Sequence, residues 1–178
     1  MSSIHDFVTF HMTPRNRILF FSLLSGILFV VIFSLIGYHP IPSSYYLNRD
    51  DGIITLSHAR NFVEYGTISI NPSGELVEGF SAPVQFWLFA GLYKLTHISY
   101  DWYNQIQTYL STFFIGMIFV LLFEEVGWEA VGLSMLAAFM LARDPSFIIW
   151  HGSGMENALT HSLFLLSFYL MVRTFRTW

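Results

Sequence analysis

The sequence contains no cysteine and little charge for its length. None of its 178 residues is cysteine, so disulfide scaffolds, thiolate zinc sites, iron–sulfur ligation and cysteine nucleophiles are excluded. Charged residues make up 11% of the chain, against roughly 25% in soluble proteins, and hydrophobic residues make up 54%. Because so little charge cannot cover a water-facing surface, the composition indicates an integral membrane protein.

Concentrated positive charge is also missing. Eight basic residues are scattered among twelve acidic ones, which gives a net charge of −4. Nucleic acid is therefore not an expected partner, because binding a phosphate backbone requires a basic stripe or patch. The seven histidines show no metal-binding spacing of the HxxxH or HExxH type, so neither a divalent metal nor another cofactor is expected.

Long uncharged runs predict an all-α, polytopic membrane fold. A helix needs about 20 mostly apolar residues to cross a bilayer. Four segments fit as spans, namely 18–37, 106–123, 126–150 and 155–172. Segment 84–98 is shorter and carries Lys94, so we expect it to dip into the outer leaflet. If it crossed instead, Asp50 and Glu156 would lie on opposite sides of the membrane.

Flanking charges orient the first span. Arg15 and Arg17 precede it, which places residues 1–17 in the cytoplasm by the positive-inside rule. No small-residue cleavage site follows the span, so we expect a retained anchor. Residues 18–178 then form one transmembrane module, and residues 38–103 form its water-facing outer loop.

The outer loop is expected to hold a short amphipathic helix on the membrane surface. Its predicted range is 52–65, with Gly66 as the C-terminal stop. Asp50 and Asp51 stand at its start. One carboxylate could serve as a general base while the other positions it or holds its protonation state. Alternatively, Asp50 caps the helix and Asp51 interacts with the helix dipole.

Five short motifs follow one another in a recognisable order. They are Asp50-Asp51-Gly52-Ile53-Ile54, Ala59-Arg60-Asn61-Phe62, Ile70-Asn71-Pro72-Ser73-Gly74-Glu75, Val77-Glu78-Gly79-Phe80-Ser81-Ala82-Pro83 and Ser153-Gly154-Met155-Glu156. Their order and spacing resemble the C-type glycosyltransferases, and more closely the bacterial arabinofuranosyltransferase-like branch. The chain departs from that pattern at Gly52, where alanine is usual, and at Phe80, where tyrosine is common.

The resemblance implies a transferase in the bacterial cytoplasmic membrane, with its active loop on the outer face. Such an enzyme moves a sugar, with inversion, from a polyprenyl-phosphate donor to a glycan, lipid or protein acceptor of the cell envelope. Asp50 would be the catalytic base, with Asp51 beside it. Members of the family continue through more spans, so we expect a truncated or partial module. The alternative is a non-catalytic membrane subunit, or an inactive remnant, that binds a partner membrane protein.

The same motifs supply candidate substrate-binding residues, each of which has a structural alternative. Arg60 could hold a phosphate or pair with Glu64 one helical turn later. Glu156 could bind substrate or complete a capping box with Ser153. His58 is expected to be a polar residue at the membrane interface. The candidates are His58, Arg60, Asn61, Glu78 and Glu156.

Overall fold

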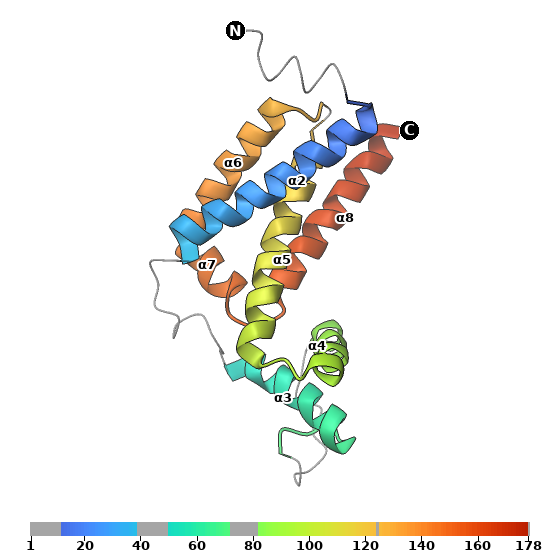
Figure 1. Cartoon of the computed structure of the whole chain (residues 1–178), viewed down its shortest axis with the longest axis vertical. Helices are drawn as coiled ribbons and strands as arrows, with labels where there is room; N and C mark the ends of the chain where they lie inside the picture. Colours follow the sequence, from blue (N-terminus) through green and yellow to red (C-terminus); the bar gives the residue numbers. More distant parts are fainter. Residues whose placement is uncertain (1–11, 39–49, 72–81, 124, 178) are drawn as a thin grey trace. The chain divides into compact units, whose positions relative to one another are not determined.

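The computed structural model describes residues 12–38, 50–71, 82–123 and 125–177, and every regular element within these ranges is a helix. The all-α prediction is therefore confirmed for this part of the chain. In order, the elements are α2 (Pro14–Ile32), the π-helical η1 (Phe33–Tyr38), α3 (Asp50–Tyr65), α4 (Pro83–Thr96), α5 (Tyr100–Leu121), α6 (Trp128–Arg143), α7 (Pro145–His151) and α8 (Asn157–Thr177) (Figure 1).

Two compact units make up the chain. The first unit comprises Met1–Pro40, Ser111–Pro145 and His161–Trp178. The second unit comprises Ile41–Leu110 and Ser146–Thr160. The second unit therefore holds α3, α4, the first half of α5, α7 without its first residue, and the start of α8.

Two helices are long and apolar enough to cross a membrane. Pro14–Gly37 has 24 residues and Asn157–Arg176 has 20. At 1.5 Å per residue each reaches ~30 Å or more, the thickness of the hydrocarbon core. They correspond to the predicted spans 18–37 and 155–172.

The predicted span 126–150 is not one continuous helix. It is divided into α6 and α7, which meet at a bend of 86°. The break lies at Asp144, whose backbone is extended with φ −85° and ψ 109°. Pro145 explains it, because a proline disfavours helical angles at the residue before it and contributes no N–H. Counted as one broken span, the pair is a third candidate.

Helices α4 and α5 are not among the helices long and apolar enough to cross a membrane. Helix α4 has 14 residues, which at 1.5 Å each gives ~21 Å. That is shorter than the hydrocarbon core of about 30 Å. Helix α5 covers most of the predicted segment 106–123 but begins at Tyr100. Polar side chains in its first half, among them Asn104 and Gln107, lower its hydropathy.

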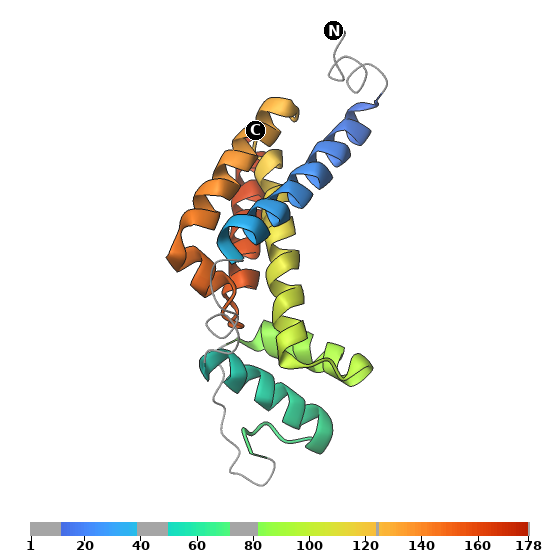
Figure 2. The same cartoon turned by 60° about the vertical axis from the view of Figure 1, so that its left-hand side comes forward.

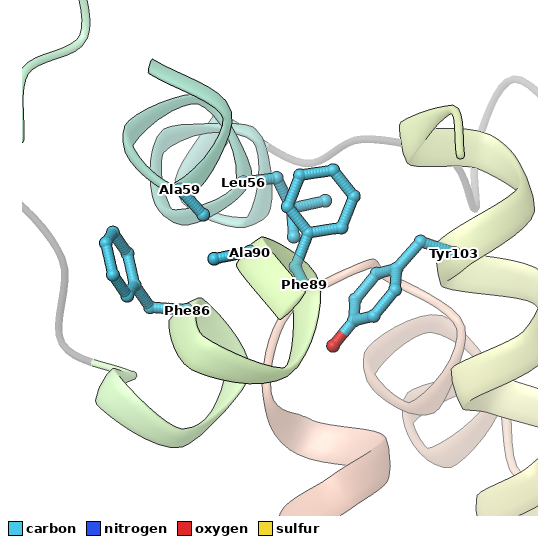
Figure 3. Packing of buried hydrophobic residues seen from close by; sticks show 6 residues of the cluster. All are labelled: Leu56, Ala59, Phe86, Phe89, Ala90 and Tyr103. Atoms are coloured by element: carbon cyan, nitrogen blue, oxygen red, sulfur yellow. The ribbon is translucent and has the colours of Figure 1, made fainter. Parts of the chain in front are cut away.

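The second unit is organised around the packing of α3 along α4 (Figure 2). Its core contains Leu56 and Ala59 from α3, Phe86, Phe89 and Ala90 from α4, and Tyr103 from α5 (Figure 3). The small alanines let the two helices approach closely, and the aromatic rings fill the space beside them. The rings of Phe89 and Tyr103 meet edge to face, with centroids 4.9 Å apart.

The helix predicted over 52–65 is confirmed, and so is its end. Helix α3 begins two residues before the predicted range and ends at Tyr65. Gly66 follows with a left-handed φ of 71°. Its N–H donates to the carbonyl of Phe62 at 3.0 Å. Glycine adopts this conformation without steric penalty, so it ends the helix as its position in the sequence predicts.

In the first unit, small and polar residues join three helices. The Ser25 hydroxyl of α2 donates to the Gly116 carbonyl of α5 at 2.8 Å. It lies 2.6 Å from the hydroxyl of Ser134 on α6. Since Ser25 has already used its proton, Ser134 is the donor in the second bond. A Cβ on Gly116 would lie 2.6 Å from the Cβ of Phe29, so only glycine allows this approach.

Candidate functional site

The two adjacent acids occupy the N-terminus of α3. Asp50 and Asp51 are the first two residues of that helix. Their backbone is described, whereas their side chains, like Glu78, lie outside the described residues. A carboxylate at this place is favoured by the helix dipole. That general effect is compatible with both the catalytic and the capping alternatives.

A contact between two glycines brings the first and last sequence motifs together. A Cβ built on Gly52 would lie 2.8 Å from both the carbonyl carbon and the oxygen of Gly154. It would also lie 3.2 Å from the amide nitrogen of Met155. The backbones therefore touch where Gly52 has no side chain, so a residue with a Cβ at this position would clash with the loop. Residues 50–52 and 153–156, about a hundred positions apart, share one place in the second unit.

Side-chain amides hold the loop between α7 and α8. Asn104 donates to the Gly152 carbonyl at 3.0 Å, and Gln85 donates to the Gly154 carbonyl at 2.8 Å. Gln107 donates to the Met155 carbonyl at 3.0 Å. Gln85 and Asn104 are each only 1% exposed. Because these bonds are shielded from water, they fix the loop backbone more firmly than exposed bonds would.

The conformation of the loop also depends on Gly154. Its φ of 79° is left-handed, a region that side chains with a Cβ rarely adopt. Thr108, one turn after Asn104 on α5, donates to the His151 carbonyl at 3.4 Å. These amide and hydroxyl contacts are not predicted from the sequence. The available signal is the set of Asn104, Gln107 and Thr108, whose spacing puts polar side chains on one face of a largely apolar helix.

Glu156 does not take part in a capping box. In that motif, the glutamate is the third residue inside the helix. Here α8 begins at Asn157, and the Glu156 carbonyl accepts from the Thr160 N–H at 2.8 Å. Ser153 instead accepts from the Met155 N–H at 3.3 Å and donates to the Trp150 carbonyl at 2.9 Å. The carboxylate of Glu156 is partly exposed and has no ion pair or hydrogen bond among the described residues.

Arg60 lies over an aromatic ring, and none of the acids among the described residues forms an ion pair with it. Its guanidinium carbon lies 5.6 Å from the centroid of the Tyr100 ring. No ion pair joins Arg60 to Glu64, although both residues are described, so the structural alternative for Arg60 is not observed. The Nε of Arg60 is buried without a partner. Stacking uses the face of the guanidinium and leaves N–H groups at its edge for an anion.

Glu64 has a different partner. The Tyr93 hydroxyl donates to Glu64 Oε1. The pKa of Tyr93 is raised. The largest cause is this hydrogen bond, and burial and the negative charge of Glu64 add to it. The contact joins the C-terminal ends of α3 and α4. Glu64 is therefore bonded to Tyr93 and forms no ion pair with Arg60.

His58 and Asn61 are buried supports of α3. Both are 0% exposed, so the interfacial position expected for His58 is wrong. Nδ1 of His58 donates to the Ile54 carbonyl at 2.7 Å, one turn earlier. Asn61 Nδ2 donates to the carbonyls of Ser69 at 2.8 Å and Ile70 at 2.7 Å. The His58 bond stays within α3, whereas the two Asn61 bonds fix the segment that follows the helix.

Within the described ranges, no group of three histidine, aspartate or glutamate residues lies close enough to hold a metal ion. Comparison with known proteins adds no assignment: no protein-family model, curated protein or solved structure matches the chain. The candidate site is therefore described by its own geometry, in which Gly52 contacts the backbone of Gly154 and Met155.

Proposed function

We propose that the chain is a membrane glycosyltransferase module of the C type, acting on the outer face of a bacterial cytoplasmic membrane. It transfers a sugar, with inversion, from a polyprenyl-phosphate donor to a cell-envelope acceptor. The observation that carries the proposal is the backbone contact between Gly52 and Gly154. This contact puts the Asp50-Asp51 motif beside the motif that ends in Glu156, as a shared active site requires.

In the proposed reaction, Asp50 takes the proton from the acceptor hydroxyl. The hydroxyl oxygen attacks the anomeric carbon of the donor from the side opposite the phosphate. The bond between that carbon and the phosphate oxygen breaks, and polyprenyl phosphate leaves with the electron pair. Phosphate is a good leaving group, so no separate general acid is required. General-base assistance of this kind is worth about 10²–10⁴ in rate.

Arg60 is the proposed contact for the donor phosphate. Its guanidinium is held over Tyr100 and is not neutralised by Glu64. A phosphate would accept charge-assisted hydrogen bonds from the free edge of the guanidinium. Glu156, whose carboxylate has no partner among the described residues, is the proposed acceptor for a sugar hydroxyl. Asp51 is proposed to position Asp50.

The proposed topology has four spans and a cytoplasmic N-terminus. Helices α2 and α8 are long and apolar enough to cross, and α6 with α7 forms a bent third candidate. In this proposal α5 crosses as well, and its polar first half serves the outer face. Helix α4 does not cross. Residues 50–71 and 152–156 then face the same aqueous side.

The test compares two aspartate substitutions in membranes that contain the full chain. A panel of polyprenyl-phosphate pentoses and hexoses is supplied, and release of polyprenyl phosphate is followed by mass spectrometry. Asp50→Asn should lower the rate at least about 100-fold. Asp101→Asn, which removes an exposed acid from the first turn of α5, is the control and should keep the wild-type rate.

Two results would count against the proposal in different ways. If Asp50→Asn transferred sugar as fast as the control, Asp50 would not be the base. If the wild-type chain released no polyprenyl phosphate from any donor, the proposal of a non-catalytic subunit would gain. Co-purification of a stoichiometric membrane partner would then support that alternative.

A further inference from the structure

The first unit contains a charged cavity that the proposed reaction does not use. The cavity has a volume of about 240 Å³ and lies where the start of α2 meets the connection between α5 and α6. Arg17, Glu125 and Glu129 contribute its charges, and Phe21 and Trp128 contribute its aromatic wall. Since one water takes about 30 Å³ of liquid volume, the space suits a small polar group.

Among the described residues, no ion pair joins the charges around this cavity. Nε of Arg17 is buried without a hydrogen-bond partner. Among the described residues, neither Glu125 nor Glu129 makes an ion pair with Arg17. Arg17 as a whole is partly exposed, but its buried Nε–H has no acceptor, so a ligand that supplied an anion there would be stabilised. The two carboxylates, in turn, favour a cation at the other side of the same ligand.

The aromatic wall consists of two rings in contact. The rings of Phe21 and Trp128 meet edge to face, with centroids 5.2 Å apart and an interplanar angle of 81°. Phe21 is fully buried, at 0% exposed. Gly127, the N-cap of α6, also lines the cavity and provides no side-chain cap for the first N–H groups of the helix. Those groups add partial positive charge to the lining of the cavity.

The location of the cavity points to a lipid as the ligand. Arg17 lies in the first turn of Pro14–Gly37, a candidate membrane span, and so near the depth of the headgroups. Ile18 and Leu19 follow it and are 43% and 54% exposed. An acyl chain can lie along such apolar side chains while its headgroup occupies the cavity.

We infer that this cavity binds the headgroup of an aminophospholipid. The phosphate accepts hydrogen bonds from Arg17, and the primary ammonium donates to Glu125 and Glu129. A lipid with a phosphate but no ammonium leaves the two carboxylates unpaired. A lipid with a quaternary ammonium cannot donate hydrogen bonds to them. Phosphatidylethanolamine is therefore preferred over phosphatidylglycerol and phosphatidylcholine.

Native mass spectrometry of the purified full chain in detergent tests this preference. Each of the three lipids, with matched acyl chains, is titrated separately. The wild type should bind phosphatidylethanolamine about tenfold more tightly than the other two. Arg17→Gln should weaken that binding about tenfold, which corresponds to ~1.4 kcal/mol. The double change Glu125→Gln with Glu129→Gln should remove the preference over phosphatidylglycerol.

Arg15→Gln is the matched control. Arg15 belongs to the same helical turn, is exposed, and does not line the cavity. It removes the same charge from the same flank of the span, so any general effect on insertion or fold affects both variants. Its affinity for phosphatidylethanolamine should stay within about twofold of the wild type, a difference of less than ~0.5 kcal/mol.

Three results would overturn the inference. The first is equal weakening by Arg17→Gln and Arg15→Gln. The second is binding of phosphatidylglycerol or phosphatidylcholine as tightly as phosphatidylethanolamine by the wild type. The third is binding of soluble phosphoethanolamine as tightly as the lipid, which would assign the cavity to a free metabolite. None of these results depends on sugar transfer.

Discussion

Substituting Gly52 by alanine tests whether the contact between residues 50–52 and 153–156 is as tight as the structure has it. The new Cβ would lie 2.8 Å from the carbonyl carbon and oxygen of Gly154. Side-chain carbons essentially never come within 3.0 Å of another heavy atom. The opposing atoms belong to the backbone of a loop that Gln85, Asn104 and Gln107 hold through hydrogen bonds. The loop therefore cannot move without straining those bonds.

Two opposing effects set the magnitude. Replacing glycine by alanine in a helix contributes up to about 1 kcal/mol of stability through backbone entropy. Overpacking against a fixed surface costs about 1–3 kcal/mol. The net expectation for Gly52→Ala is a destabilisation of ~0–2 kcal/mol. The loop would also move away from the N-terminus of α3, which separates Asp50 from Glu156 and should lower sugar transfer.

Gly91→Ala is the matched control. Gly91 lies inside α4 and is exposed, and a Cβ added to it would meet no heavy atom within 4 Å. It gains the helix propensity without the clash, so it should stabilise the protein by up to about 1 kcal/mol. Thermal unfolding in detergent, followed by intrinsic tryptophan fluorescence, measures both variants. Gly52→Ala should lower the unfolding temperature or leave it unchanged, whereas Gly91→Ala should raise it.

The close contact between Gly52 and Gly154 would be refuted if Gly52→Ala raised the unfolding temperature as much as Gly91→Ala. That result would mean that α3 and the loop are separated enough to admit a methyl group. The proposed active site, which requires Asp50 and Glu156 to share one place, would then lose its structural support.

Two further predictions concern the buried amide of α3 and the topology. Asn61→Asp removes both donors to Ser69 and Ile70 and buries a carboxylate, so it should lower the free energy of unfolding by about 3 kcal/mol or more. Chemical denaturation measures this loss, and a change below ~1 kcal/mol would show that the Asn61 bonds are not retained in the membrane-embedded protein. Because the chain has no cysteine, single cysteines at Tyr65 and Glu125 report topology directly with a membrane-impermeant thiol reagent. Both positions are exposed, and the four-span proposal expects labelling of Tyr65→Cys alone from outside the cell. Labelling of both would mean that α5 does not cross.

Local signals in the sequence were enough to predict individual helices. Apolar periodicity and Gly66 predicted α3 and its end, because both depend on residues within one or two turns. Pro145 carried a local signal for the break between α6 and α7. The hydropathy of residues 126–150 predicts one continuous span, but hydropathy does not register the missing N–H of Pro145.

The contacts of the candidate site could not be predicted in the same way. Gln85, Asn104 and Gln107 donate to a loop that is about 45 to 70 residues away in the chain. Nothing in a local pattern states which carbonyl a buried amide will meet. Arg60 illustrates the same limit, since helical spacing predicted Glu64 as its partner, whereas the Tyr100 ring, from another helix, is what it meets. Order and spacing of the motifs suggested one site, and the backbone contact at Gly52 gives that suggestion a physical basis.

The hydroxyl contacts of Ser25 imply an order of assembly for the first unit. When α2 is synthesised, Gly116 and Ser134, the two partners of Ser25, have not yet been made. A serine in an isolated membrane helix can bond to a carbonyl one turn earlier in its own helix. If Ser25 makes such a bond before α5 and α6 are present, it exchanges that bond for those to Gly116 and Ser134 when the unit forms. Such an exchange contributes only about 0.6 kcal/mol. The consequence is for the order of assembly, because the Ser25 hydroxyl can be hydrogen-bonded within α2 first and can bond to α5 and α6 afterwards.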